Sequence, residues 1–378
     1  MFLKEGKIER YLKDLKAVLT QKEIEIESLK KYPASIENKT LPDFTKISGK
    51  EFNVGESWGG KDKSCWFRAE VIVPEDWKLE QGNIYLEIIP GKAHPGGLSG
   101  AESLLYLNGR PLQGLDRNHS LVKLNEKDLK NRNLVVAVKA FSGLESETQQ
   151  FKKAALIFRD QSTEEFYRLA KTLKQSIETM TEGENLRGKL LNILNHAFNL
   201  IDFRKPGSEK YLKTAAEANQ YLKDALAELK SESNLPAITA VGHSHIDVAW
   251  LWRLLHTREK TARTFSTVLK LMDEYPDYTF VQSSPQLYKF IKEDYPEIYA
   301  KIKEKIREGK WEVTGGMWVE ADCNLTSGES LVRQFLHGRQ FIKEEFDLDW
   351  NILWLPDVFG YSWALPQIIK KSGMNYFM

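Results

Sequence analysis

The sequence predicts a multidomain α+β and α/β protein: an N-terminal helix, a β-sandwich, a helical segment, and the first part of a barrel-like α/β domain. Three observations carry this prediction. Apolar residues recur at helical spacing near the N-terminus and again after residue 163, short β-prone runs fill the stretch between, and strand-like and helix-like runs alternate from residue 237 onward. With 378 residues, 42% of them hydrophobic, the chain can form two or three domains with buried cores.

Helical spacing of apolar residues defines the first and third units. Apolar residues from Ile8 to Leu19 lie three and four positions apart among lysines and glutamates, which predicts an amphipathic helix over residues 1–30 that packs on a neighbouring element. We assign residues 1–45 to this N-terminal helical segment. The same spacing over residues 163–235 predicts a helical linker of two helices, which Pro206-Gly207 separates.

The second unit, residues 46–162, has the pattern of a β-sandwich. Its β-prone runs are short and are separated by glycine, proline and asparagine. These runs are Cys65–Val73, Ile84–Ile89, Leu104–Leu107, Leu121–Leu124 and Leu134–Phe141. Its tryptophans and histidines are not clustered in sequence, so a structural role is favoured over a sugar-binding platform.

The fourth unit, residues 236–378, alternates strands with amphipathic helices. Strands are expected to begin near Ala237, Tyr278, Trp311 and Asn351, and a helix-like stretch follows each of them. Such alternation predicts a parallel sheet whose crossover helices cover its faces. In barrel-like α/β folds the loops that follow the strands form the active face.

Two histidines and a carboxylate lie within five residues, directly after the apolar run Ala237–Val241. If that run is a strand, alternate residues share a face, so His243, His245 and Asp247 project together from its end. Imidazole nitrogen and carboxylate oxygen suit a catalytic Zn²⁺ site with an open position. A single buried histidine most often makes ordinary hydrogen bonds, but three such groups in phase favour metal binding.

Two further carboxylates follow later strand-like runs. Asp357 comes after the apolar residues 352–355, and Asp322 lies in the run Gly315–Asn324. An aspartate in such a position is commonly a helix N-cap, and the residue type alone leaves that alternative open for Asp357. The repeated pattern of carboxylates at strand ends instead predicts one site assembled from several strands.

Composition excludes several classes of partner. The formal net charge is +1, so no bulk attraction to nucleic acid or to an anionic membrane is expected. The two cysteines, Cys65 and Cys323, fall in different predicted domains, which argues against a disulfide framework and favours a reducing compartment. The first residues lack the apolar core of a signal peptide, and no apolar run reaches about 18 residues, so a cytoplasmic location is predicted.

Three motifs resemble glycoside hydrolase family 38, the zinc-dependent retaining α-mannosidases. They are His-Ser-His-Ile-Asp-Val-Ala-Trp-Leu-Trp at 243–252, Gly-Gly-Met-Trp-Val-Glu-Ala-Asp-Cys-Asn at 315–324 and Trp-Leu-Pro-Asp-Val-Phe-Gly-Tyr-Ser at 354–362. The stretch 315–328 is more similar to the bacterial and cytosolic branch than to the Golgi and lysosomal one. The resemblance implies a jelly-roll-like sandwich and the start of a (β/α)7-type barrel of the glycoside hydrolase/deacetylase kind.

The resemblance also implies residue roles. Zn²⁺, or another divalent metal such as Co²⁺, would be bound by His245, Asp247 and Asp357, and Asp357 would be the nucleophile. Trp250 and Phe359 would line the sugar site, although core packing is an equally common fate for such aromatics. Asp322 matches an acidic position of the family and is assigned to substrate binding. The expected substrate is an α-mannoside oligosaccharide, and a homo-oligomer is expected for the full-length protein.

The resemblance places the fourth metal ligand and the acid/base carboxylate further along than this chain extends. We therefore expect the chain to be a truncated N-terminal part of the catalytic domain, inactive on its own. A metal-dependent amidohydrolase or deacetylase is an alternative, because His-x-His also opens many such sites. That class would need further histidine ligands, whereas only His256 and His337 follow, both on predicted helices. A catalytically silent carbohydrate-binding fragment is the other alternative.

Overall fold

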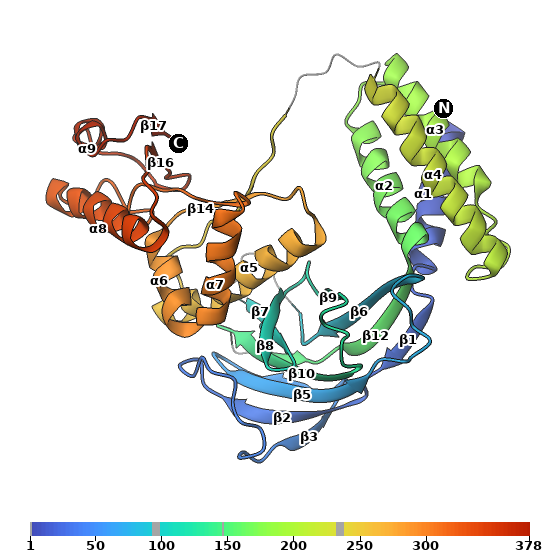
Figure 1. The fold of residues 1–378 in the computed structure, drawn as a ribbon, viewed down its shortest axis with the longest axis horizontal. Coiled ribbons are helices and arrows are strands. Elements are labelled where there is room, and N and C mark those ends of the chain that lie inside the picture. The colour runs from blue at the N-terminus through green and yellow to red at the C-terminus, as the bar shows by residue number, and fades with distance from the viewer. Residues whose placement is uncertain (1, 93–98, 146, 232–237) are drawn as a thin grey trace.

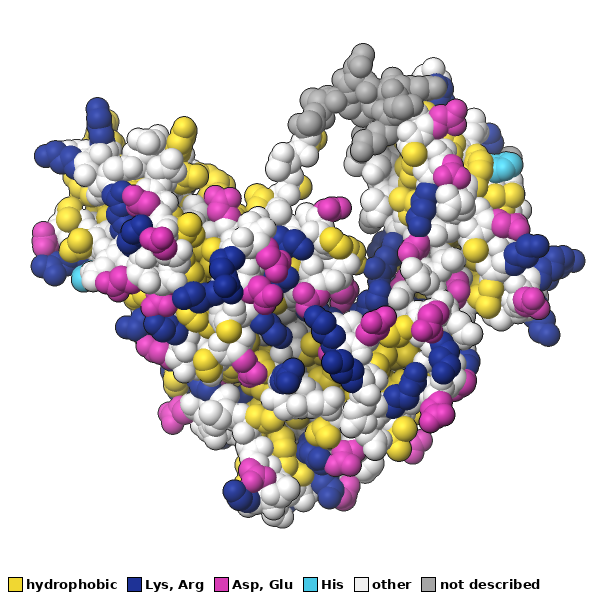
Figure 2. All heavy atoms as spheres, viewed as in Figure 1, with side chains coloured by type: hydrophobic (Ala, Val, Ile, Leu, Met, Phe, Trp, Pro, Cys, Tyr) yellow, Lys and Arg dark blue, Asp and Glu magenta, His cyan; other side chains and the backbone are white. Residues whose placement is uncertain are grey.

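The computed structural model describes residues 2–92, 99–145, 147–231 and 238–378. A β-sandwich forms the base of the molecule, and a helical bundle and an α/β domain rise from its two ends (Figure 1). No helix in these described ranges is long and apolar enough to cross a membrane. Basic and acidic side chains are interspersed over the face shown in Figure 2, as a net charge near zero leads one to expect.

Two antiparallel sheets form the sandwich. The four-stranded sheet has the order β1-β12-β6-β9, and the six-stranded sheet has the order β3-β2-β5-β10-β7-β8; β11 and β4 form a small third sheet. The strands are β1 Lys22–Glu25, β2 Ser28–Ala34, β3 Lys50–Asn53, β4 Ser57–Gly59, β5 Ser64–Ile72, β6 Gly82–Ile89, β7 Ser99–Leu107, β8 Arg110–Leu115, β9 Leu121–Leu124, β10 Asn133–Gly143, β11 Thr148–Gln150 and β12 Lys153–Asp160. Alternate residues of these strands fill a core around Phe52, Phe67 and Phe151.

The predicted N-terminal helix is shorter than expected. Helix α1 spans Phe2–Ala17, and the residues assigned to the rest of the helix form strands β1 and β2. Strand β1 pairs with β12, so that Lys22 faces Phe158, and β2 lies between β3 and β5. The helical prediction for residues 18–30 was wrong because pairing with strands far along the chain overrides local spacing. The sandwich therefore begins at Lys22 rather than at residue 46.

The helical segment is a bundle with α1 rather than a linker of two helices. Its described residues form three helices, α2 Gln161–Glu178, α3 Asn185–Leu200 and α4 Glu209–Ser231. The chain turns between α2 and α3, where Gly183 has a φ of +92°. Ile8 and Leu15 of α1 are fully buried with apolar residues of the other three helices, which are Phe166, Leu194, Phe198, Tyr211 and Leu222. The bundle thus has a core of its own.

Strands and helices alternate in the α/β domain, as predicted. Its elements are β13 Gly242–His243, α5 Leu254–Glu274, β14 Phe280–Gln282, α6 Pro285–Asp294, α7 Pro296–Arg307, β15 Trp311–Val313, α8 Gly328–Phe346, β16 Ile352–Leu353, α9 Leu365–Lys371 and β17 Tyr376–Phe377. The parallel orders β13-β14-β15 and β16-β17 are joined by a parallel bridge from Gly315 to Leu353. Five short parallel strands result, and closure into a barrel remains a prediction.

Helix α5 connects the α/β domain to the sandwich. Tyr106 and Trp66 of the six-stranded sheet belong to the same buried cluster as Phe265 of α5 and Trp311 of β15. The backbone N–H of Gly114 on β8 donates to Oγ1 of Thr267, 3.2 Å away. A Cβ at Gly114 would lie 2.6 Å from the carbonyl oxygen of Arg263, so only glycine permits this approach.

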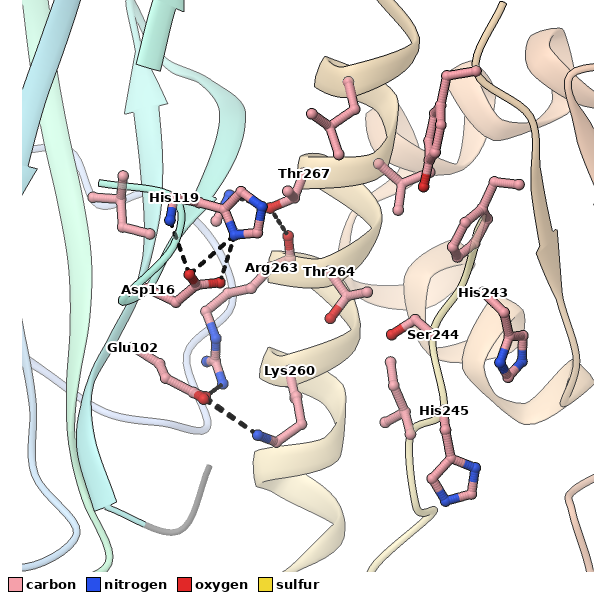
Figure 3. A pocket seen from close by; sticks show the side chains of 17 residues that line it. Glu102, Asp116, His119, His243, Ser244, His245, Lys260, Arg263, Thr264 and Thr267 are labelled. Carbon is pink, nitrogen blue, oxygen red and sulfur yellow. Dashed lines mark hydrogen bonds and ion pairs between the residues drawn. The ribbon is translucent and has the colours of Figure 1, made fainter. Parts of the chain in front are cut away.

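Charged contacts reinforce this interface. Glu102 of β7 forms ion pairs with Lys260, at 3.4 Å, and with Arg263, both on α5. Asp116 and His119, on the same sandwich side of the pocket as Glu102, pair with each other at 2.9 Å, and the pocket has a volume of about 320 Å³ (Figure 3). Each of these charged side chains has a partner, so we assign them to the packing of the α/β domain on the sandwich.

Candidate active site

The loops that follow β13, β15 and β16 lie at one edge of the parallel sheet. His245 and Asp247 come from the first loop, Glu320 from the second and Asp357 from the third. The first strand is Gly242–His243, not the apolar run 237–241. Residue 237 lies outside the described residues, and residues 238–241 precede the strand without joining it. His245 and Asp247 are therefore loop residues, placed beyond the strand rather than on it.

The three predicted ligands meet at this edge. Nε2 of His245 lies 3.1 Å from Oδ1 of Asp247 and 3.7 Å from Oδ2 of Asp357. Their side chains are 31%, 36% and 58% exposed, so solvent reaches all three. In the described part of the chain, no three His, Cys, Asp or Glu side chains are already arranged to hold a metal ion. The three groups thus form an ion-paired cluster rather than a finished coordination shell.

A third carboxylate contacts the other nitrogen of the same imidazole. Oε2 of Glu320 lies 2.7 Å from Nδ1 of His245, and Oε1 of Glu320 accepts a hydrogen bond from Oγ of Ser283, 2.5 Å away. From the residue types alone, Glu320 was a candidate, with Asp322, only for the catalytic acid should the chain hydrolyse mannosides by itself, and its contact with His245 was not predicted. Its position two residues before Asp322, within the motif 315–324, was the signal available in the sequence.

These carboxylates stabilise positive charge on His245. Its contact with Glu320, followed by the smaller influence of Asp247, raises the pKa of His245 to about 9, although burial acts in the opposite direction. A cation is therefore favoured at the point where the three carboxylates converge.

His243 does not join this cluster. Its ring packs against Trp354, with centroids 4.9 Å apart, and its Nε2 atom is buried without a hydrogen-bond partner. Burial lowers the pKa of His243, which favours a neutral ring. The expectation that His243, His245 and Asp247 share a strand face was wrong, because the strand ends at His243 and the loop sets the direction of the two later side chains.

The helix-cap alternative for Asp357 is excluded, because the helix that follows, α9, begins only at Leu365. Asp322, by contrast, has a local structural role. Its Oδ1 accepts hydrogen bonds from the backbone N–H groups of Asn324 and Leu325, at 2.9 and 2.7 Å. These bonds stabilise the loop after β15. Substrate binding by Asp322 stays a prediction.

The two aromatic residues assigned to the sugar site are not core residues. Trp250 is 60% exposed and Phe359 is 89% exposed. They lie three residues after Asp247 and two after Asp357, on loops at the same edge of the sheet. Ala249 has a φ of +79°, a conformation that an alanine rarely adopts, in the same loop as Trp250. The exposure of both rings fits contact with a ligand.

The remaining histidines of the α/β domain do not extend the site. His256, buried on α5, contacts Asp62 of the sandwich at 2.9 Å, and His337 is exposed on α8. In Figure 3 the ring of His245 points away from the charged residues of the interdomain pocket. The described residues thus give no support to the histidine-rich site expected of an amidohydrolase.

Comparison with known proteins identifies both major domains. Residues 236–378 match the glycosyl hydrolases family 38 N-terminal domain, and residues 23–172 match the alpha-mannosidase jelly roll domain. The second match agrees with the sandwich that begins at Lys22.

Proteins from several organisms are similar over most of this chain. Alpha-mannosidase G of Dictyostelium discoideum is 32% identical over 92% of the chain and 32% of its own length. Human alpha-mannosidase 2C1 is 33% identical over 86% of the chain and 31% of its own length. The alpha-mannosidase of Saccharomyces cerevisiae is 28% identical over 88% and 32%. The chain thus spans about a third of the length of the curated relatives it matches. Both domains of these enzymes are thus matched in sequence order, and residues 236–378 are those of the glycosyl hydrolases family 38 N-terminal domain.

Proposed function

We propose that this chain supplies the metal-binding and nucleophilic part of a zinc-dependent, retaining α-mannosidase. The observation that carries the proposal is the convergence of His245, Asp247 and Asp357 from two loops of the parallel sheet. The names of the relatives support mannosides as the substrate class. The rest of a (β/α)7 barrel would complete the site in the whole protein.

The donor set fits Zn²⁺. One imidazole nitrogen and two carboxylates are ligand types of catalytic zinc, and two ligands held at about 2.0–2.1 Å in a tetrahedral site lie roughly 3.3 Å apart. Nε2 of His245 lies 3.1 and 3.7 Å from the nearest oxygens of Asp247 and Asp357, so small rotations of these exposed carboxylates would suffice. A bound Zn²⁺ would act as a Lewis acid that holds and polarises sugar hydroxyls.

The residues of the chain would then act in two steps. An oxygen of Asp357 attacks the anomeric carbon while the bond to the glycosidic oxygen breaks, and an acid from elsewhere in the protein protonates that oxygen. Water then cleaves the glycosyl ester and releases mannose with its anomeric configuration retained. The second carboxyl group of a retaining enzyme lies about 5–5.5 Å from the nucleophile. Trp250 and Phe359 would offer apolar surfaces to the sugar ring.

The metal assignment is tested first, on the chain as it is. We expect the purified protein to bind Zn²⁺, and we expect His245→Ala and Asp357→Asn to reduce the bound metal measured by elemental analysis. His337→Ala is the matched control, because His337 is exposed on α8 and should leave metal content unchanged. Equal metal content in wild type, His245→Ala and Asp357→Asn would reject the assignment.

The reaction class is tested with an aryl α-mannoside. The assay uses the chain together with a polypeptide that supplies the rest of the family's catalytic domain, and Asp357→Ala should lower turnover by several orders of magnitude. An inverted product anomer, or full activity of the variant, would reject the nucleophile role. Release of acetate or ammonia from amide substrates would favour the amidohydrolase class.

A further inference from the structure

Glu320 contacts His245 on the side of the ring that faces away from Asp247 and Asp357. Its Oε2 atom lies 2.7 Å from Nδ1 in an ion-pair contact and, among the described residues, has no hydrogen-bond partner. The Glu320 side chain is only 11% exposed, against 58% for Asp357. A carboxylate this buried, with one oxygen against a ring nitrogen, has little freedom to reach solvent or a substrate.

Ser283 holds the other oxygen of Glu320. This serine, 1% exposed, follows β14 and donates from Oγ to Oε1 at 2.5 Å. The loop after β15 passes close to it, because a Cβ at Gly315 would lie 3.2 Å from Cβ of Ser283, and Gly315 has a φ of +128°. Glycine at 315 therefore permits the approach of the loop that carries Glu320. Oε1 of Glu320 is held by the hydrogen bond from Ser283, and Oε2 lies in ion-pair contact with His245.

The chemistry of imidazole gives this arrangement a consequence. A histidine that binds a metal through Nε2 must carry its proton on Nδ1, and the hydrogen-bond partner of Nδ1 sets both the tautomer and the ring orientation. Here Glu320 lies on the Nδ1 side, and the carboxylates of Asp247 and Asp357 lie on the Nε2 side. Nδ1 thus faces the residue that would orient the ring, and Nε2 faces the two residues that would bind the metal together with it.

We infer that Glu320, held by Ser283, is a positioning residue that keeps the proton on Nδ1 of His245 and aims Nε2 toward the metal. This inference rests on the proposed zinc site. It also argues against Glu320 as the catalytic acid, because Oε1 bonds to Ser283 and Oε2 lies against Nδ1 of His245, on the side of the ring away from Asp357.

Zinc affinity of four variants tests the role. The Zn²⁺ dissociation constant is measured by competition with a chromogenic chelator, and unfolding curves confirm that each variant folds. Glu320→Leu should bind Zn²⁺ about 10- to 100-fold more weakly, the usual effect of losing such a partner. Glu320→Gln should stay within a few-fold of wild type, because its amide oxygen still accepts from Nδ1, and Ser283→Ala should fall between them. Glu312→Gln, an exposed carboxylate on β15, is the control for the loss of one negative charge.

A second measurement needs no metal. The imidazole N–H protons of the metal-free protein are observed by NMR, with His245→Ala to assign the signal. A proton held between Nδ1 and the buried Glu320 should be shifted downfield and exchange slowly with water. It should persist in Glu320→Gln and disappear in Glu320→Leu. This readout distinguishes failure of the positioning role from failure of the zinc proposal, since it applies even if wild type binds no Zn²⁺.

Wild-type zinc affinity in Glu320→Leu would overturn the inference. So would an equal loss in Glu320→Gln and Glu320→Leu, because charge rather than hydrogen bonding would then be the cause. A slowly exchanging His245 proton that is unchanged in Glu320→Leu would also overturn it.

Discussion

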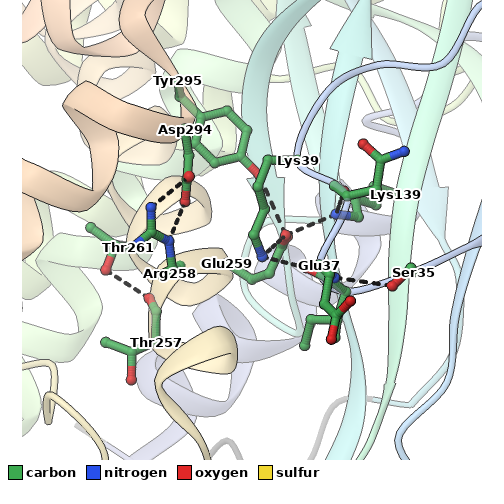
Figure 4. A network of polar contacts seen from close by, with 12 residues as sticks. Ser35, Glu37, Lys39, Lys139, Thr257, Arg258, Glu259, Thr261, Asp294 and Tyr295 are labelled. Carbon is green, nitrogen blue, oxygen red and sulfur yellow. Dashed lines mark hydrogen bonds and ion pairs between the residues drawn. The ribbon is translucent and has the colours of Figure 1, made fainter.

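Replacing Glu259 with leucine should separate the α/β domain from the sandwich more effectively than any exposed substitution. Glu259 lies on α5, and its Oε1 atom is 2.9 Å from Nζ of Lys39 and 2.8 Å from Nζ of Lys139 (Figure 4). The three side chains are 7%, 9% and 3% exposed. Lys139 also donates to the carbonyl oxygen of Asn38 at 2.5 Å. The variant would leave two buried ammonium groups without their carboxylate.

The expected loss of stability follows from this burial. Removing one partner of a buried ion pair costs about 3–5 kcal/mol, because the remaining charge is left desolvated. Since two lysines lose their partner here, we expect the upper part of that range for Glu259→Leu. Lys139→Met should cost less, about 1.5–3 kcal/mol, because Lys39 still binds Glu259. The double variant should be less destabilised than the sum of the two, because the partners are coupled.

Urea unfolding followed by tryptophan fluorescence measures these effects, with the transition of the α/β domain analysed separately because a multidomain chain need not unfold in one step. Lys343→Met is the control. Lys343, exposed on α8, pairs with Asp347, the residue directly after that helix, and loss of this exposed pair should leave the transition unchanged. A midpoint for Glu259→Leu equal to that of wild type would refute the reasoning, as would additive effects in the double variant.

Three further predictions concern the same interface and the site. Burial raises the pKa of Glu259, but Lys139 and Lys39 outweigh it and hold that pKa below its usual value of 4.5. The stability contributed by Glu259 is therefore present above pH 4.5 and lost as the pH falls through the lowered value, so Glu259→Gln should flatten the acid limb of a stability–pH curve. Gly114→Ala should destabilise the protein by about 1–3 kcal/mol in thermal unfolding, because its Cβ would meet the Arg263 carbonyl. The control is Gly188→Ala: this glycine lies in a helix, its Cβ would have nothing within 4 Å, and the substitution should be neutral or stabilising. Trp250→Ala should weaken mannose binding in calorimetry at unchanged melting temperature, because the ring is exposed.

Local periodicity predicted the helices of the α/β domain because their apolar faces are local features. Phe265, Leu269 and Met272 are spaced at three and four positions, and all are buried on α5. The same rule failed for residues 18–30, where the pattern after Leu19 continues into strands. Strand β1 forms by pairing with β12, which lies more than a hundred residues later in the chain. A prediction from the local sequence cannot include that pairing.

The meeting of His245, Asp247 and Asp357 was predictable for a topological reason. Parallel strands end at the same edge of a sheet, so short polar residues after two such strands come together whatever the details of the loops. The contact of Glu320 depends on how closely the loop after β15 approaches Ser283, a tertiary feature that residue types do not encode. Which way the His243 side chain points relative to His245 depends on where the strand ends, and the ends of strands and helices are the features that a sequence predicts least reliably.

The sandwich also bears on the site, through the start of α5. The backbone N–H of Arg253 donates to Nδ1 of His256 at 3.0 Å, so Nε2 of that ring carries the proton that faces Oδ1 of Asp62, 2.9 Å away. Arg253 itself pairs with the same Asp62. A sandwich residue thus fixes the first turn of α5, directly after the loop that carries His245, Asp247 and Trp250. Because Glu259 anchors the next turns of the same helix, the sandwich determines where that loop ends and so limits the positions its side chains can take.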